Sequence, residues 1–366
     1  MRILILSNNI IGLYSFRKEL VQVLINKGYE VFISCPIEDN IIQTEWFNKL
    51  GCEIIDTPFN RKGTNPIADF RLLVRYIKML KRLSPKVVLS YTIKPNVYGG
   101  LAGAFCGVPQ VANITGLGAA VENPGLLQKV AIFMCKIGMR KTNMTFFQNN
   151  ENRQFCLSHG MVRGLNQLIP GSGVNLDYHK MEPYPNVAES IRFLFVSRIR
   201  KEKGIEEYLS CAEYIRSKYP YVEFHIVGFC EGDYEQRLTD MQRKSIIVFH
   251  GKQSDVRPFY KMANCTIHPT FYPEGMSNVL LESCATGRPI ITTDRAGCRE
   301  IVEDGVNGYV VRQRDAQDLI KKVEKFISLP YEEKVAMGRA ARAKMEREFD
   351  RKIVVDAYLN AIKNLK

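Results

Sequence analysis

The 366-residue sequence lacks the cysteine pairs, long apolar runs and secretion signal that mark several classes of protein. Its ten cysteines contain no C-x-x-C pair and are scattered from Cys35 to Cys298, which argues against a zinc site or a disulfide framework. The sequence contains no run of about 18 apolar residues, so it predicts no transmembrane helix. The start, MRILILSNNIIG, lacks the cationic and long apolar regions of a signal peptide. We therefore expect a protein of the reducing cytoplasm, with its cysteines acting as small buried apolar side chains.

A dinucleotide-binding fingerprint is also missing. The stretch from Ser7 to Ser15, after the first expected strand, contains a single glycine, Gly12, where G-x-G-x-x-G would be needed. The five histidines have no metal-ligand spacing, and His250 and His268 fall at the ends of expected strands. Hydride transfer is therefore a poor prediction, and we expect neither a cofactor nor a bound metal.

Positive charge is concentrated in the first half of the chain. Residues 1–175 hold 20 Lys and Arg against 10 Asp and Glu, so they carry most of the formal net charge of +13. A soluble, solvated surface would explain part of this excess. The alternative that we favour is an anionic partner for the N-terminal half.

Short apolar runs alternate with amphipathic helical patterns, which predicts parallel sheets covered by helices on both faces. The expected strands are residues 3–6, 31–34, 87–90, 108–113 and 144–148, then 193–196, 223–227, 246–249, 265–268 and 289–292. Length favours two domains. We predict an N-terminal domain over 1–175, a linker over 176–190, a C-terminal domain over 191–348, and a last helix over 349–366. Ligands of such sheets bind beyond the carboxyl ends of the strands, so we expect the site in the cleft between the domains.

The segment PEGMSNVLLE, from Pro273 to Glu282, carries the strongest chemical signal. It follows an expected strand and contains a glycine turn, then Ser277 as an N-cap, then a helix. Unpaired amides and the positive dipole end at such a helix start form an anion site. Glu274 and Glu282 flank that start, and carboxylates accept charge-assisted hydrogen bonds from sugar and ribose hydroxyls. A capped helix with two solvated glutamates is the alternative interpretation.

A second segment, SRIRKEKG from Ser197 to Gly204, follows the first strand of the second half. Its basic side chains can hold a diphosphate leaving group. Taken alone it would be a solvated basic loop, so Arg198 and Lys203 gain weight only beside the glutamate segment.

The sequence resembles glycosyltransferase family 4, of GT-B architecture, over essentially its whole length. The resemblance rests on EGMSNVLLE (Glu274 to Glu282), SRIRKEKG, PGSGVN (Pro170 to Asn175) and GCREIVEDGVNGYVV (Gly297 to Val311). It implies two Rossmann-like domains around a central cleft, with the C-terminal helix crossing back to the first domain. It also implies a retaining transferase that needs no metal.

The resemblance assigns roles to matching positions. Arg198 and Lys203 would hold the donor diphosphate, Glu282 the ribose and Glu274 the transferred sugar, so that Glu274, Arg198 and Lys203 form the catalytic set. The remaining donor-side candidates are Gly12, His250, Gly275, Met276, Ser277 and Asn278. His250 would line the nucleobase pocket, and Gly12, in the first βα loop, would let that loop approach the donor. The divalent ion of the alternative GT-A fold needs a D-x-D pair, which is absent; Glu231-Gly232-Asp233 comes nearest.

A narrower resemblance, to bacterial surface-polysaccharide transferases, rests on YTIKPNVYGG (Tyr91 to Gly100) and NITGLGAAV (Asn113 to Val121). It implies a UDP-sugar donor and an acceptor saccharide linked to undecaprenyl diphosphate. The acceptor-side candidates are Tyr91, Lys94, Asn96, Thr115, Gly116 and Glu122. Family members often carry a donor-contacting histidine where this chain has Thr115 to Gly118, so no histidine role is carried over. The loop has Ile11-Gly12 for the usual double glycine, and Asn175 for the usual aspartate.

Two basic amphipathic stretches suggest contact with a membrane. They run from Phe70 to Lys86 and from Leu126 to Lys141. Both can form helices that lie on an anionic surface, where each basic residue adds about 1 kcal/mol. An ordinary sheet-covering helix with a cationic outer face is an equal alternative. With a lipid-linked acceptor, we expect a peripheral protein on the cytoplasmic face of the membrane.

Two other functions stay open at this point. A sugar-nucleotide 2-epimerase could share the architecture, although the few histidines near the expected cleft disfavour acid–base chemistry on both faces of a sugar. A non-catalytic protein could use the basic half for nucleic acid or membrane, although basic and aromatic residues do not interleave in a nucleic-acid motif.

Overall fold

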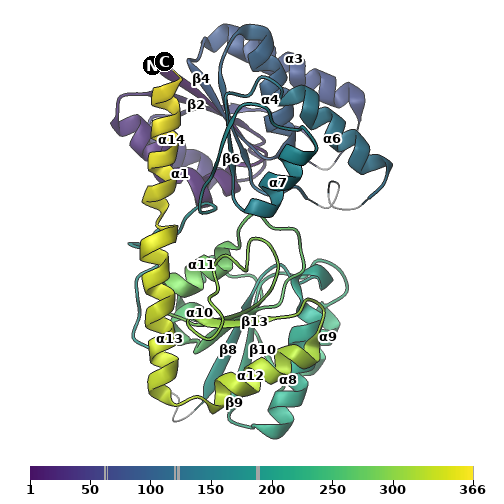
Figure 1. The fold of residues 1–366 in the computed structure, drawn as a ribbon, viewed down its shortest axis with the longest axis vertical. Coiled ribbons are helices and arrows are strands. Elements are labelled where there is room, and N and C mark those ends of the chain that lie inside the picture. Colours follow the sequence, from purple (N-terminus) through teal and green to yellow (C-terminus); the bar gives the residue numbers. More distant parts are fainter. Residues whose placement is uncertain (62, 64, 119–120, 122–123, 187–189, 366) are drawn as a thin grey trace. The chain divides into compact units, whose positions relative to one another are not determined.

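The computed structural model describes residues 1–61, 63, 65–118, 121, 124–186 and 190–365. Its contacts divide the chain into two compact units, Met1–Ser172 together with Lys352–Lys366, and Gly173–Arg351. We call these unit 1 and unit 2. Each unit is an α/β domain built on one parallel sheet (Figure 1). The predicted fold class is confirmed.

Unit 1 contains a seven-stranded parallel sheet in the order β3-β2-β1-β4-β5-β6-β7. Successive residues of its first strand point to opposite faces of the sheet, as strand geometry requires. Ile3 and Ile5 face one core, whereas Leu4 and Leu6 face the other. The strands are β1 (Arg2–Leu6), β2 (Glu30–Cys35), β3 (Glu53–Asp56), β4 (Val87–Tyr91), β5 (Gln110–Ile114), β6 (Met144–Phe147) and β7 (Leu165–Leu168).

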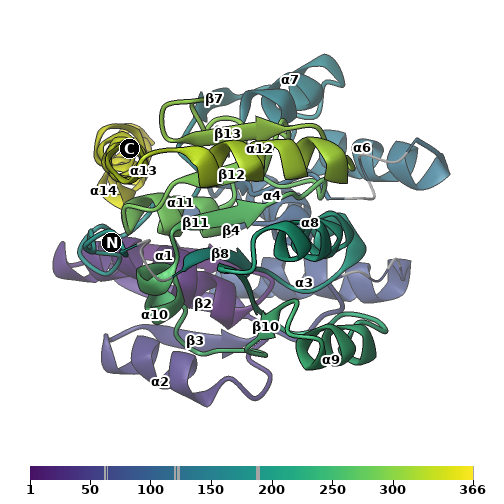
Figure 2. The same ribbon diagram turned by 90° about the horizontal axis from the view of Figure 1, so that it is seen from below.

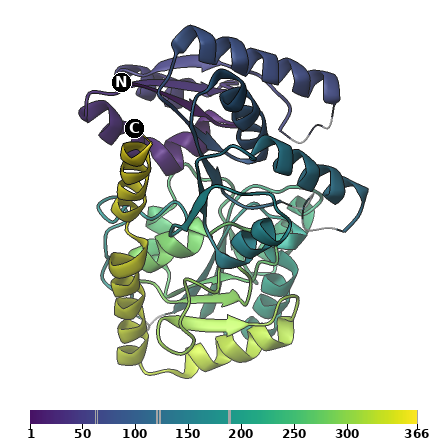
Figure 3. The ribbon, with the colours of Figure 1, turned by 45° about the horizontal axis from the view of Figure 1, so that its top comes forward.

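Helices cover both faces of this sheet. One face packs against α1 (Ile10–Asn26), α2 (Ile41–Lys49) and the last helix, α14 (Arg351–Asn364). The other face packs against α3 (Pro66–Leu83), α4 (Ile93–Cys106), α6 (Leu126–Gly138) and α7 (Asn150–Ser158). Figure 3 shows α3, α4 and α6 as a row of neighbouring helices. The chain's last helix thus completes the core of its first domain, as the fold prediction states.

Unit 2 contains a six-stranded parallel sheet in the order β10-β9-β8-β11-β12-β13. Its strands are β8 (Ile191–Val196), β9 (Val222–Val227), β10 (Val248–Phe249), β11 (Cys265–His268), β12 (Ile290–Thr293) and β13 (Gly308–Val311). The helices α8 (Ile205–Lys218), α9 (Glu235–Arg243) and α12 (Ala316–Ser328) cover one face. The helices α10 (Arg257–Met262), α11 (Asn278–Ala285) and α13 (Tyr331–Lys344) cover the other (Figure 2).

The long C-terminal helical stretch is interrupted between α13 and α14. After α13 comes a π-helical turn, η2 (Met345–Phe349), and then an extended residue, Asp350. Val174 pairs with this point like a strand, because its amide donates to Phe349 and its carbonyl accepts from Arg351 at 2.8 and 3.0 Å. This pairing ends one helix and starts α14.

The segment predicted as a linker is fastened to unit 2 over much of its length. The buried guanidinium of Arg288 donates to the carbonyl oxygens of Glu182 and Pro183, at 3.1 and 2.8 Å. Arg342 donates to the carbonyl of His179 at 2.9 Å. Residues 187–189 of this segment lie outside the described part of the chain.

Candidate functional site

The cationic loop after β8 lies against the loop that follows β11. Gly204 ends the short 3₁₀ turn η1 (Lys201–Lys203) with φ +80°, and a Cβ there would lie 2.1 Å from the carbonyl oxygen of Pro269. Only glycine allows this approach without displacement of one backbone. The amide of Phe271 and the hydroxyl of Thr270 both donate to the carbonyl of Glu202, at 3.0 and 3.2 Å. The predicted basic and glutamate segments are therefore brought together.

Glu274 lies at the centre of a charged cluster that is largely buried around its carboxylate. Its carboxylate contacts the ammonium of Lys203, and Nε2 of His268 lies 3.4 Å from the same oxygen. Burial alone would raise the pKa of Glu274, but Lys203 and His268 lower it to about 2. Burial lowers the pKa of His268, although Glu274 opposes this shift. Glu274 is therefore ionised at neutral pH, so it accepts hydrogen bonds and cannot serve as a general acid.

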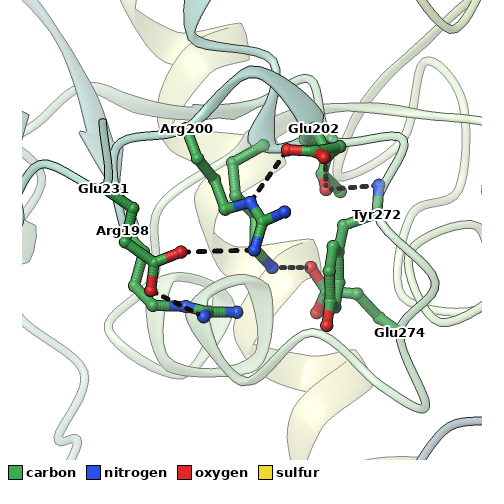
Figure 4. A network of polar contacts seen from close by, with 8 residues as sticks. Arg198, Arg200, Glu202, Glu231, Tyr272 and Glu274 are labelled. Carbon is green, nitrogen blue, oxygen red and sulfur yellow. Dashed lines mark hydrogen bonds and ion pairs between the residues drawn. The ribbon is translucent and has the colours of Figure 1, made fainter. Parts of the chain in front are cut away.

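The two arginines of the basic loop are held by carboxylates and by an aromatic ring (Figure 4). Glu231 accepts from Arg198 and Arg200 at 2.9 and 3.2 Å, and Glu202 accepts from Arg200 at 2.8 Å. The ring of Tyr272 lies within 4.7–5.7 Å of the charged groups of Lys203, Arg200 and Arg198. Three cations thus gather around one ring, and each is also paired with a carboxylate that holds its charged group in place.

The start of α11 lies beside this cluster and keeps hydrogen-bonding capacity. Ser277 occupies the predicted N-cap position, but its buried hydroxyl makes no capping bond and has no partner among the described residues. The amide of Ser277 donates to the carbonyl of Gly297 at 2.8 Å. Asn278 is the first residue of the helix. The backbone of Gly297 packs against that of Gly275, since a Cβ on Gly297 would lie 2.8 Å from the carbonyl oxygen of Gly275. A buried hydroxyl and the first-turn amides are thus available to an anion.

Two donor-side candidates differ in what their side chains can do. Met276 is buried in the core beneath α11, so its side chain packs and only its backbone remains for a ligand. Glu282 accepts a hydrogen bond of 3.1 Å from the hydroxyl of Tyr260. Burial raises the pKa of Glu282 to about 7, against smaller opposing effects of Tyr260 and Arg351. The two glutamates of one segment therefore have opposite pKa shifts.

His250 follows β10 at the same carboxyl edge of the sheet. Its Nε2 lies 3.0 Å from Nδ1 of His225, and its ring contacts Phe259 of α10. The amide of Gly228 donates to the carbonyl of Gly251 at 2.9 Å, which joins this loop to the one after β9.

The N-terminal candidates in unit 1 are placed differently from the expectation. Gly12 lies in the first turn of α1, where its amide donates to the N-cap Asn9, and not in the loop before it. Tyr91 and Asn96 are buried; Asn96 donates to the carbonyl of Asn113 at 2.9 Å. Tyr91 lies on a central strand whose two faces are both covered by helices, and Asn96 lies on the buried side of the helix that follows, so both side chains belong to the interior of unit 1.

Three further acceptor-side candidates, Lys94, Thr115 and Gly116, are half-buried. Lys94 forms an ion pair of 2.5 Å with Asp69. Thr115 and Gly116 follow β5 and are half-buried, and Glu122 lies outside the described residues.

Several site residues escaped the sequence reasoning. Tyr272, Arg200 and Glu231 belong to the cluster, and His268 touches Glu274. The sequence offered one signal for Tyr272, namely that it is an aromatic residue only two positions before Glu274. Within the described residues, no group of three or more His, Cys, Asp or Glu could hold a metal ion. Over the same part of the chain, no helix is long and apolar enough to cross a membrane.

Comparisons with known proteins identify the family of the chain. A model described as "Glycosyl transferases group 1" matches residues 180–344, and one described as "Glycosyl transferase 4-like" matches residues 2–149. The chain belongs to the glycosyltransferases. The first match lies within unit 2 and the second within unit 1. The first match contains every residue of the charged cluster.

The relatives and solved structures below match between 69% and 100% of this chain. An N,N'-diacetylbacillosaminyl-diphospho-undecaprenol alpha-1,3-N-acetylgalactosaminyltransferase of Campylobacter jejuni is 24% identical, covering 98% of this chain and 97% of its own. A UDP-Gal:alpha-D-GlcNAc-diphosphoundecaprenol alpha-1,3-galactosyltransferase of Escherichia coli is 26% identical over 69% of each chain. The structure of HepE from Anabaena in complex with UDP has a TM-score of 0.79 at 17% identity and covers both chains fully. This last likeness concerns the fold.

Proposed function

We propose that the transferase moves a hexose or N-acetylhexosamine from a UDP-sugar to a polyprenyl-diphosphate-linked saccharide, with retention and without a metal ion. The observation that carries this proposal is the buried Lys203–Glu274 pair, placed between two further arginines and a helix start with an unused buried hydroxyl. Relatives in Campylobacter jejuni and Escherichia coli are named for acceptors on diphosphoundecaprenol, and HepE was solved with UDP and with UDP-glucose.

The donor site has a division of labour between cations and carboxylates. Arg198 and Lys203, with the amides at Ser277 and Asn278, neutralise the charge that develops on the departing diphosphate. Glu282, once ionised, accepts hydrogen bonds from the ribose hydroxyls. Glu274 stays ionised and accepts from hydroxyls of the transferred sugar, which orients the reacting carbon. The acceptor attacks on the face that the diphosphate leaves, and a donor phosphate oxygen takes its proton.

The acceptor half of the proposal concerns unit 1 and a membrane. In α3 the apolar residues Leu72, Tyr76, Met79, Leu80 and Leu83 face the core, which leaves the basic residues outside. In α6 an apolar face remains exposed, with exposed fractions of 79% for Leu126, 52% for Leu127, 50% for Val130, 59% for Phe133 and 44% for Ile137. Lys129 and Lys136 flank that face. We assign α6 to insertion at the cytoplasmic face of an anionic membrane, and α3 to electrostatic attraction alone.

The decisive experiment is transfer from UDP-sugars to a synthetic polyprenyl-diphosphate saccharide, followed by NMR of the anomeric proton of the product. We expect an anomer of the same configuration as the donor, unchanged turnover in EDTA, and strong loss for Glu274→Ala, Lys203→Ala and Glu282→Ala. Glu213→Gln, at an exposed position of α8, is the matched control. Full activity in all three site variants would refute the site, and an inverted product or loss in EDTA would refute the mechanism. Epimerisation of the donor alone would favour a 2-epimerase.

A further inference from the structure

Two imidazoles in unit 2 are joined edge to edge. Nδ1 of His225 lies 3.0 Å from Nε2 of His250, with the ring planes within 9° and the centroids 5.3 Å apart. Nearly coplanar rings with this nitrogen contact are the geometry of an in-plane N–H···N hydrogen bond. His225 is buried on β9, whereas His250 is half-buried and begins the loop after β10.

A carboxylate holds the inner end of this chain. Oε2 of Glu223 lies 3.0 Å from Nε2 of His225, and the same oxygen accepts from Nε of Arg192 at 3.1 Å. Glu223 and His225 are two residues apart on β9, so their side chains lie on one face of the strand. The series is therefore Arg192, Glu223, His225 and His250, running from β8 toward the carboxyl edge of the sheet.

The hydrogen-bond chemistry of the series fixes the tautomer of its last member. The ionised Glu223 can only accept, so Nε2 of His225 carries a hydrogen. In a neutral ring this leaves Nδ1 of His225 as an acceptor, which requires the hydrogen on Nε2 of His250. Nδ1 of a neutral His250 then has no hydrogen and is an acceptor.

His250 contacts the same helix and loops that hold residues of the proposed donor site. Phe259 contacts the ring of His250 at a centroid distance of 4.8 Å, and the next residue of α10, Tyr260, donates to Glu282. On the other side, the loop of His250 is bonded to the loop after β9, which carries Glu231 beside Arg198. His250 is thus placed among elements that also hold the predicted ribose and diphosphate groups.

We propose that Glu223 and His225 are positioning residues that keep Nδ1 of His250 free of hydrogen, so that His250 accepts a hydrogen bond from the imide N3–H of uracil. This inference rests on the proposed donor site. It adds the origin of base selectivity: uracil donates at N3, whereas cytosine has only an acceptor there.

Protonation reverses the outer hydrogen-bonding group. One hydrogen fits between the two rings, so the pair can take up one extra proton but not two. With His225 fully protonated, Nε2 of His250 becomes the acceptor and Nδ1 gains the hydrogen. Burial lowers the pKa of both histidines, Glu223 raises that of His225, and Arg192 lowers it. Glu223 and Arg192 are the charged side chains that shift the pKa of His225. The contact from α10 is made by Phe259, which carries no charge. The reversal is therefore expected below about pH 6.5.

The test is the ratio of UDP to CDP affinity, measured by calorimetry between pH 5 and 8. Ribose and diphosphate are common to both probes, so changes at Glu282 cancel and the ratio isolates the base contact. One neutral hydrogen bond corresponds to a factor of about two to ten. We expect UDP to be favoured by that factor at pH 8. At low pH the preference should be lost or reversed, because the hydrogen on Nδ1 of His250 then meets the N3 acceptor of cytosine.

Three variants separate positioning from a structural role. His225→Gln keeps a donor toward Glu223 and an acceptor toward Nε2 of His250, so the preference for UDP should remain at pH 8. Any pH step that is left should come from protonation of His250 alone. His225→Phe should lose the preference at every pH. Glu223→Gln should shift the step to lower pH, because the carboxylate stabilises the imidazolium. His159→Gln, in unit 1, is the control and should match the wild type.

The outcomes are distinguishable from failure of the proposed function. If neither UDP nor CDP binds at any pH, the donor site itself is refuted. If both bind with a ratio that is independent of pH, or if His225→Phe retains the preference and the step, the positioning role is refuted. ¹⁵N shifts of His250 give a direct check, since Nδ1 must report an unprotonated nitrogen at pH 8.

Discussion

At the scale of single residues, the two glutamates of one motif have opposite electrostatics. Glu274 lies against Lys203 and His268, which lower its pKa to about 2, whereas Glu282 has a tyrosine hydroxyl and burial raises its pKa to about 7. Sequence spacing cannot distinguish them, because the difference comes from residues that are distant along the chain. The first carboxylate stabilises the fold when it is charged, and the second destabilises it.

This difference predicts the pH dependence of stability. The pKa of Glu282 is about 7 in the folded protein, whereas an unperturbed glutamate has a pKa of 4.5, so its ionisation weakens the fold as pH rises from 4.5 to 7. Glu282→Gln should therefore be more stable than the wild type at pH 8, by about 2–3 kcal/mol, and similar at pH 4.5. Thermal unfolding across this range measures the difference.

Glu274→Gln is the matched control with the opposite sign. Its carboxylate contributes stability that is complete above pH 4.5 and is lost as pH falls toward 2. The variant should be less stable than the wild type at pH 8. Equal pH profiles for the two variants would contradict the pKa assignments.

The motifs indicated which charged residues of unit 2 lie together, but not which other side chains surround them. Glu274, Lys203 and Arg198 lie together in unit 2, as the motifs indicated. Tyr272 and Glu231 were missed because a ring beneath cations and a carboxylate between arginines have no fixed spacing. The burial of Asn96 was not predictable from its spacing: its polar side chain is satisfied inside unit 1, where Ser90 donates to it at 2.8 Å.

At the scale of secondary structure, the interior strands were predictable and three edge strands were not. Continuous apolar runs mark the buried strands of both sheets. The missed strands β3, β7 and β13 end the two sheets; β3 and β7 are largely exposed and carry polar residues, and β13 is short and begins at a glycine. Their pairing depends on a neighbour that the local pattern does not reveal.

The turn after β8 gives a test at this scale. Gly204→Ala would place a methyl group 2.1 Å from the carbonyl of Pro269 and strain a backbone at φ +80°. We expect UDP affinity to fall at least tenfold, because Lys203 would move from Glu274, and stability to fall by about 1–3 kcal/mol. Calorimetry and thermal unfolding check both effects.

Gly232→Ala is the control for backbone strain alone. Gly232 has φ +98° but open space around the position of a Cβ. This variant should lose some stability and keep its UDP affinity. A similar loss of affinity in both variants would show that the close approach at Gly204 does not position the site.

The exposed apolar face of α6 gives a second test. Phe133→Asp and Val130→Asp should each reduce binding to vesicles that contain anionic lipid, and added salt should not restore it. Ile42→Asp is the control, since Ile42 is 75% exposed on α2, away from the α3, α4 and α6 row. Vesicle co-sedimentation measures the difference. Equal losses for Ile42 and Phe133 would contradict the assignment of α6.

At the scale of the whole molecule, unit 1 is assembled from the two ends of the chain. Val354, Val355, Tyr358, Ala361 and Ile362 of α14 belong to the same core as β1 and α1. The hydroxyl of Tyr358 accepts from the amide of Asn113 at 2.8 Å, and both residues are buried. A polar bond inside an apolar contact fixes how α14 sits on the sheet.

Tyr358→Phe should therefore destabilise unit 1. The change leaves the buried amide of Asn113 without this acceptor, at a cost of about 1–3 kcal/mol. Hydrogen exchange should show the loss in β5 and α14, with unit 2 unaffected. Tyr221→Phe, at an exposed position of unit 2, is the control. Uniform loss of protection in both units would contradict a local role.

The discontinuity of unit 1 also bears on the order of events during synthesis. Domains generally fold from the N-terminus as the ribosome releases them. Here α14 is made after all of unit 2, so the first domain to be translated is the last to close its core. A nascent chain that has passed residue 172 still exposes the apolar surface of β1 and α1 that α14 later covers. Stalling before α14, or a lesion within it, would thus expose the beginning of the protein to chaperones and proteases.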